Sequence, residues 1–120
     1  MKKILVLDDD KLVLASVDKI LKKEGYLTEL AQSAQEALEK AQAQEFDLVI
    51  SDIRMPGKNG VEAVREIRRL FDEKMKKDIP IIFITGYAEI GDELKAENIG
   101  EIILKPFDLQ RLLITVREYL

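Results

Sequence analysis

Cysteine and histidine are both absent from this chain of 120 residues. Without cysteine, the protein can form neither a disulfide framework nor a thiolate metal site. Without histidine, it has no imidazole base and lacks the usual ligand for zinc, copper and iron. Any bound metal ion must therefore be held by oxygen atoms, which favours magnesium, calcium or manganese.

A long hydrophobic run is missing near the start of the chain, and positive charge is not in excess. The apolar run after Lys2 and Lys3 stops at Asp8, which is too short for a signal peptide or a membrane span. We therefore expect a cytoplasmic protein that makes no membrane contact. The formal net charge of -4 argues against direct nucleic-acid binding.

The length of the chain suits a single domain. No internal repeat, low-complexity stretch or interdomain linker interrupts the sequence. We therefore expect one domain over residues 1–120, with no output domain after Leu120.

Four short apolar segments that contain isoleucine or valine, and a weaker one at residues 26–31, alternate with segments of helical periodicity. The predicted strands cover residues 4–7, 26–31, 48–50, 79–84 and 102–104, and the predicted helices lie within 13–21, 34–41, 64–71, 87–98 and 109–120. Such alternation predicts an α/β fold in which helices cover both faces of a parallel sheet. In the strand order 2-1-3-4-5, the first and third strands are adjacent.

Several local signals predict where the helices begin and end. Ser33 and Glu36 form a capping-box pattern. Asn59 and Asp108 are good N-cap residues. Gly25 suits the position that follows a helix end.

The carboxyl ends of the predicted strands carry groups suited to phosphoryl chemistry. Three consecutive aspartates, residues 8–10, follow the first strand, and Asp52 follows the third. Thr85 and Lys105 follow the fourth and fifth strands. Because parallel strands end at one edge of the sheet, these groups are expected to converge. Clustered carboxylates repel one another, so they need a cation or a proton. A hard divalent ion can bridge carboxylate and phosphoryl oxygens. A carboxylate can also act as a nucleophile and form an acyl phosphate.

These motifs together resemble the receiver domain of two-component response regulators. The resemblance covers essentially the whole chain, and it rests on the order and spacing of the motifs. They are Leu7-Asp8-Asp9-Asp10, the run from Asp47 to Gly57 with Asn59-Gly60, Ile84-Thr85-Gly86 and Leu104-Lys105-Pro106-Phe107. The resemblance implies a flavodoxin-like (βα)5 three-layer sandwich with a central parallel five-stranded sheet in the order 2-1-3-4-5.

The resemblance also implies a phosphoacceptor site. Asp52 would accept a phosphoryl group from the phosphohistidine of a sensor histidine kinase or a phosphotransfer protein. Asp9 would bind Mg2+ directly and Asp8 would bind it through water, while Asp52 and the backbone carbonyl of Arg54 would supply further ligands. Mn2+ would be able to replace Mg2+.

Two further groups and the signalling output follow from the same resemblance. Thr85 and Lys105 would contact the phosphoryl oxygens. Phosphorylation would then switch the binding of a downstream protein or an attached output domain. Such a module phosphorylates and dephosphorylates itself and is not a turnover enzyme.

The chain departs from the family's pattern in a few positions. Ile102 stands where the family often has an aromatic residue or histidine that moves inward on activation. The segment between Thr85 and Lys105 is slightly shorter than usual. Arg54 and Tyr87 occupy variable positions that tune the lifetime of the acyl phosphate in similar proteins.

Other interpretations stay open at the level of the sequence. Asp8-x-Asp10 superficially fits an aspartate-nucleophile phosphohydrolase with Asp8 as the nucleophile, although Leu12 stands where that motif has threonine or valine. A receiver that is never phosphorylated could serve as a scaffold. Taken singly, Asp10 suits a helix N-cap and Asp52 suits a turn.

Overall fold

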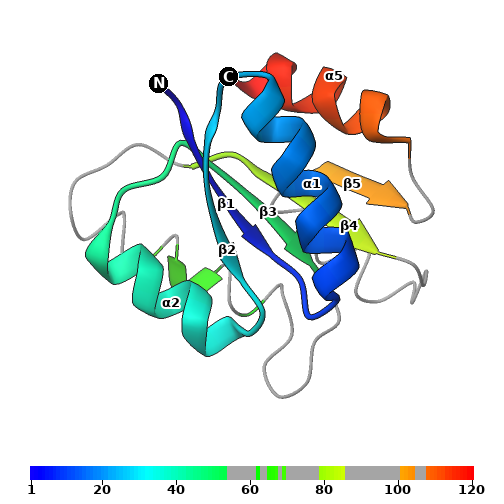
Figure 1. The fold of residues 1–120 in the computed structure, drawn as a ribbon. Coiled ribbons are helices and arrows are strands. Elements are labelled where there is room, and N and C mark those ends of the chain that lie inside the picture. Colours follow the sequence, from blue (N-terminus) through cyan, green and yellow to red (C-terminus); the bar gives the residue numbers. More distant parts are fainter. Residues whose placement is uncertain (54–61, 63–64, 68, 70–78, 86–100, 105–107) are drawn as a thin grey trace.

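A five-stranded, all-parallel sheet in the order β2-β1-β3-β4-β5 forms the centre of the protein. The computed structural model describes residues 1–53, 62, 65–67, 69, 79–85, 101–104 and 108–120, apart from the side chains of Thr85 and Leu104. The strands are β1 (Lys3–Leu7), β2 (Leu27–Ala31), β3 (Leu48–Asp52), β4 (Ile81–Thr85) and β5 (Glu101–Leu104). The predicted fold class and strand order are confirmed (Figure 1).

Helices lie on both faces of this sheet. They are α1 (Lys11–Lys23), α2 (Ala34–Ala43) and α5 (Leu109–Tyr119). α1 and α5 cover one face, and α2 covers the other (Figure 1). Helical backbone at residues 62, 65–67 and 69 agrees with the third predicted helix. The predicted helix within 87–98 and the cap candidate Asn59 lie outside the described residues.

The core forms two apolar layers because successive side chains of a strand point to opposite faces. In β1, Leu5 and Leu7 pack into the layer beneath α2. Ile4 and Val6 pack into the layer beneath α1 and α5. The helices complete these layers with buried side chains, which are Ala34, Ala37 and Ala41 of α2, Leu14, Val17 and Leu21 of α1, and Leu112, Leu113 and Val116 of α5.

The capping signals predicted at Ser33, Asp108 and Gly25 are present in the structure. Ser33 Oγ accepts a hydrogen bond from the Glu36 amide at 3.1 Å, and a carboxylate oxygen of Glu36 accepts one from the Gln32 amide at 3.1 Å. Asp108 accepts from the Gln110 amide at 2.8 Å at the start of α5. Gly25 follows the end of α1 with a φ of +92°, a left-handed conformation that glycine adopts readily.

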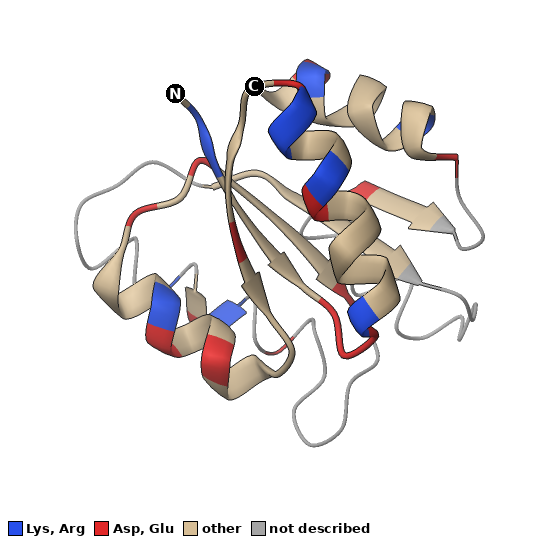
Figure 2. Ribbon diagram, in the orientation of Figure 1, with Lys and Arg blue, Asp and Glu red and all other residues tan. Residues whose placement is uncertain are grey.

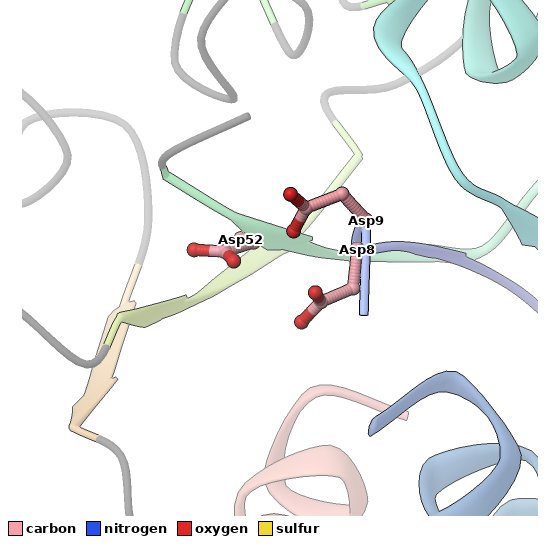
Figure 3. A group of neighbouring side chains, drawn as sticks. All are labelled: Asp8, Asp9 and Asp52. Carbon is pink, nitrogen blue, oxygen red and sulfur yellow. The ribbon is translucent and has the colours of Figure 1, made fainter. Parts of the chain in front are cut away.

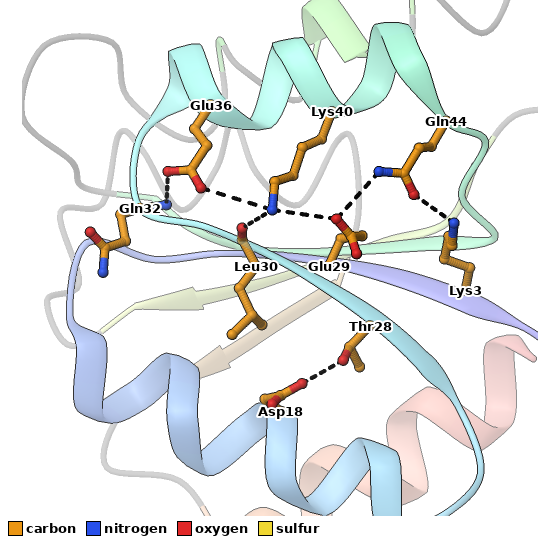
Figure 4. Close-up of polar contacts among 9 residues, drawn as sticks. All are labelled: Lys3, Asp18, Thr28, Glu29, Leu30, Gln32, Glu36, Lys40 and Gln44. Carbon is orange, nitrogen blue, oxygen red and sulfur yellow. Dashed lines mark hydrogen bonds and ion pairs between the residues drawn. The ribbon is translucent and has the colours of Figure 1, made fainter.

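Polar contacts add to the pairing of the edge strand β2 with β1, and Ala31 is the only buried residue of this strand. On the α1 face, the Thr28 hydroxyl donates a hydrogen bond to Asp18 (Figure 4). On the α2 face, Glu29 Oε1 lies 3.4 Å from the ammonium nitrogen of Lys40.

The same lysine also reaches the backbone of the edge strand. Lys40 Nζ donates to the carbonyl of Leu30 at 2.6 Å and lies 3.9 Å from Glu36. The side-chain amide of Gln44 donates to Glu29 at 3.3 Å. The pKa of Glu29 lies below its ordinary value, chiefly because of the hydrogen bond from Gln44; burial opposes this shift, and Lys40 lowers the pKa further.

Both chain termini lie at the end of the sheet where the strands begin (Figure 1). Near this end, Arg117 Nη2 of α5 donates to Glu24 Oε2, just after α1, at 2.7 Å. Among the described helices, none has the length and apolar composition to cross a membrane.

Candidate functional site

The strand register brings two of the predicted site residues together. The β1–β3 ladder pairs Leu7 with Ser51, so the next residues along the two strands are Asp8 and Asp52. The acidic residues that follow β1 and end β3 lie at the carboxyl edge of the sheet (Figure 2). The convergence expected from the strand order is therefore observed for these residues.

Three carboxylates form a compact cluster at this edge. One oxygen from each of Asp8, Asp9 and Asp52 lies within 4.8 Å of the others (Figure 3). Asp8 is 2% exposed and Asp52 is 8% exposed, whereas Asp9 is open to solvent. Like charges at this separation repel more strongly when they are buried, so a cation or a proton stabilises the cluster. Three carboxylate oxygens match the ligands that Mg2+ and Ca2+ prefer.

The third aspartate of the triplet has a different role. Asp10 is the N-cap of α1, and its Oδ1 accepts hydrogen bonds from the amides of Leu12 at 2.9 Å and Val13 at 3.4 Å. The Asp10 amide in turn donates to Asp8 Oδ1 at 2.9 Å, which orients the Asp8 carboxylate. The prediction that Asp10 caps the helix is confirmed.

The other predicted site residues are only partly described. Thr85 ends β4 and pairs with the last residue of β5, Leu104. Asp52 pairs with Ile84 on the β3–β4 ladder, so the backbone of Thr85 lies one residue beyond the level of Asp52. The side chain of Thr85 lies outside the described residues, as do Arg54 and Lys105, and their roles stay predictions.

One polar residue beside the cluster was not singled out from the sequence. Ser51 is fully buried in β3, and its hydroxyl donates to the backbone carbonyl of Asp52 at 2.9 Å. The available signal was a serine inside an otherwise apolar strand, directly before the candidate acceptor. A buried hydroxyl needs a hydrogen-bond partner, and here the partner belongs to Asp52.

Ile102, the departure from the family's aromatic position, lies in β5. It pairs with Phe83 of β4 and packs, partly buried, against the apolar layer beneath α2. An isoleucine at this position therefore contributes to the core.

A family model for the response regulator receiver domain matches residues 4–117. The chain belongs to the receiver domain family of response regulators. Receiver domains are signalling modules of two-component systems that interact with histidine kinases and bind Mg2+ at an acidic pocket, and the cluster of Asp8, Asp9 and Asp52 forms such an acidic group in this one.

Curated relatives include regulators that are longer than this receiver domain. It is 35% identical over 120 residues to the transcriptional regulatory protein YvrH of Bacillus subtilis, covering 98% of this chain and 48% of that protein. It is 34% identical over 119 residues to ZraR of Klebsiella oxytoca, covering 98% of this chain and 26% of that protein. The chain thus spans about half the length or less of these relatives.

Solved structures of similar receivers match the whole chain. The response regulator TrrA of Thermotoga maritima, solved in complex with Mg2+ and BeF, is 38% identical with a TM-score of 0.85, and the match covers 100% of both chains. The chemotaxis protein CheY4 of Vibrio cholerae is 33% identical with a TM-score of 0.88, covering 100% of this chain and 99% of that one.

Proposed function

We propose that Asp52 accepts a phosphoryl group from the phosphohistidine of a histidine kinase or a phosphotransfer protein, in a Mg2+-dependent reaction. The observation that carries this proposal is the approach of Asp8, Asp9 and Asp52 to within 4.8 Å of one another. A cluster of this kind provides both a carboxylate nucleophile and ligands for a hard cation.

The transfer has a simple chemical balance. A carboxylate oxygen of Asp52 attacks the phosphorus atom of the phosphohistidine. The phosphorus–nitrogen bond breaks, and the imidazole nitrogen keeps the electron pair and takes up a proton. The product is an acyl phosphate, which water later hydrolyses to regenerate the Asp52 carboxylate.

The three aspartates fit a magnesium site by their chemistry. Asp9 would hold the ion directly, Asp8 through water, and Asp52 and the carbonyl of Arg54 would add ligands. When bound, the ion supplies positive charge that stabilises the phosphoryl oxygens. The Asp8 carboxylate is already oriented by the Asp10 amide at 2.9 Å, so it needs little rearrangement to serve as a ligand.

Two donors are proposed for the remaining phosphoryl oxygens. Thr85 would offer its hydroxyl and Lys105 its ammonium group. The strand pairing supports this proposal, because the backbone of Thr85 at the end of β4 adjoins the strand that carries Asp52. The added negative charge would bias the packing of β4 and β5 and so change which partner binds.

A labelling experiment tests the acceptor. Incubation with acetyl phosphate and Mg2+ should add one base-labile phosphoryl group, measured by the mass of the intact protein. Asp52→Asn should abolish the label, while Asp8→Asn should keep it at saturating Mg2+. Asp10→Asn is the matched control, because asparagine also caps a helix and should leave labelling unchanged.

The alternatives make opposite predictions in the same experiment. A phosphohydrolase that uses Asp8 would lose its label in Asp8→Asn and keep it in Asp52→Asn. The hydrogen bonds from α1 to Asp10 count against that enzyme, because they commit the second aspartate of its motif to a helix cap. A scaffold receiver would show no Mg2+-dependent label at all.

A further inference from the structure

Ser51 places a hydroxyl group among apolar side chains. It is 0% exposed, and the strand register sets it between Leu7 of β1 and Phe83 of β4. Val49, two residues earlier in β3, and Ile53, just after the strand, both belong to the apolar layer beneath α2. Burying a hydroxyl there is unfavourable unless it forms a hydrogen bond.

The hydrogen bond that Ser51 donates holds the peptide group between Asp52 and Ile53. The hydroxyl donates to the carbonyl of this peptide at 2.9 Å. The amide of the same peptide, the Ile53 N–H, donates to the carbonyl of Ile84 in β4 at 3.3 Å. The peptide is therefore held at both its polar ends, at the point where β3 ends.

A fixed peptide at this point limits how far the backbone of Asp52 can rotate. That backbone sets where the Asp52 carboxylate stands relative to Asp8 and Asp9. Small displacements of a reacting group reduce rates strongly, since a shift of about 1 Å can cost on the order of a hundredfold.

We propose that Ser51 is a positioning residue that holds the Asp52 carboxylate in its reactive place, an inference that rests on the proposed function of Asp52. Ser51 lies on the opposite face of β3 from that carboxylate, because adjacent residues of a strand alternate. It therefore acts only through the Asp52–Ile53 peptide and does not touch the phosphoryl group.

The competing explanation is size. A small side chain between Leu7 and Phe83 could be needed only for room, in which case the hydroxyl is incidental. The two explanations predict different orders of labelling rate for serine, threonine, alanine and valine at position 51. Serine and threonine share the hydroxyl, alanine matches serine without it, and valine matches threonine in shape without it.

The experiment measures the rate constant for labelling with acetyl phosphate at saturating Mg2+ in the wild type, Ser51→Ala, Ser51→Thr and Ser51→Val. Alanine and valine should slow labelling about fivefold, the size expected for one lost hydrogen bond, while threonine restores the rate. The acetyl phosphate concentration that gives half the maximal rate should not change. An order set by volume, with Ala equal to Ser and Val equal to Thr, would overturn the proposal.

Amide hydrogen exchange gives a readout that does not depend on phosphorylation. The Ile53 amide should exchange about fivefold faster in the alanine and valine variants. The Val49 amide, which donates to the Pro80 carbonyl at 3.1 Å in the same ladder, is the internal control and should keep its rate. Equal Ile53 exchange in Ser51→Ala and the wild type would also overturn the proposal.

The same measurements distinguish a wrong acceptor assignment from a wrong positioning role for Ser51. If the wild type takes no label on Asp52, the acceptor assignment is wrong. If the wild type is labelled but the variants follow volume, only the positioning role is wrong. Urea unfolding of each variant shows whether a slow rate reflects a loss of folded protein.

Discussion

The acidic residues at the β2 edge lie beside a lysine ammonium, whereas those at the carboxyl ends of β1 and β3 lie beside one another. Glu29 and Glu36 both approach Lys40, at 3.4 Å and 3.9 Å. Asp8 and Asp52 instead share a cluster in which oxygens stand within 4.8 Å. The first arrangement fastens an edge strand to a helix. The second gathers like charges at one edge of the sheet, an arrangement that a bound cation would stabilise.

The largest expected difference between the two regions is in labelling. Asp52→Asn should remove all label from acetyl phosphate, because the nucleophile is gone. Glu29→Gln should keep the wild-type rate, because that carboxylate belongs to the β2 edge. Intact-protein mass spectrometry measures both. If Glu29→Gln lost as much labelling as Asp52→Asn, the acceptor role could not be assigned to the carboxylate cluster alone.

Magnesium should stabilise the folded protein through the carboxylate cluster and not through the β2 edge. At a free concentration about a hundredfold above its Kd, Mg2+ should raise the free energy of unfolding of the wild type by about 2.7 kcal/mol. Asp9→Asn should lose most of this gain, and Glu36→Gln should retain it. Urea unfolding with and without Mg2+ provides the measurement, and an equal gain in both variants would contradict a site at Asp9.

Without metal, the two regions should respond to charge removal with opposite signs. Asp52→Asn should raise the free energy of unfolding by about 1 kcal/mol, because it relieves repulsion in a partly desolvated cluster. Lys40→Met should lower it by about 1 kcal/mol, because it removes the contacts with Glu29, Glu36 and the Leu30 carbonyl. Metal-free urea unfolding checks both signs. Destabilisation by Asp52→Asn would mean that repulsion does not dominate there.

The smallest expected effect is the pH dependence contributed by Glu29. Its pKa in the folded protein is below the ordinary value of 4.5, so its ionised form favours folding. That contribution is complete above pH 4.5 and disappears as the pH falls through the lower folded pKa. Because the side chain is 34% exposed, the effect should be about 0.3 kcal/mol and should weaken with salt.

The control for this pH effect is Glu29→Gln. The stability difference between the wild type and this variant should be present at pH 6 and should shrink towards pH 3, measured by urea unfolding. A difference that stays constant across this range would assign the contribution to packing and hydrogen bonding that do not depend on charge.

The sequence predicted the site better than it predicted the β2 edge, for a physical reason. Apolar runs mark strands, and the order of parallel strands then brings Asp8 next to Asp52 without any knowledge of side-chain contacts. The helix caps at Asp10 and Ser33 were equally accessible, because a cap involves residues only a few positions apart.

Contacts between distant residues left no such pattern. Lys40 reaches Leu30 across a helix–strand connection, and Arg117 meets Glu24 across 93 positions. The predicted second strand, residues 26–31, differs from β2 only in its first residue, but its polar attachment depends on how the helices pack. Ser51 was missed because its partner is a backbone carbonyl, which every residue possesses.

The position of the two termini has a practical consequence. Both lie at the end of the sheet where the strands begin, while the carboxylate cluster lies at the other end (Figures 1 and 3). A biotin tag or a fluorescent label attached at Met1 or Leu120 would leave the acidic edge open to solution. Immobilising the protein through either terminus is therefore a suitable geometry for surface measurements of kinase docking and phosphotransfer.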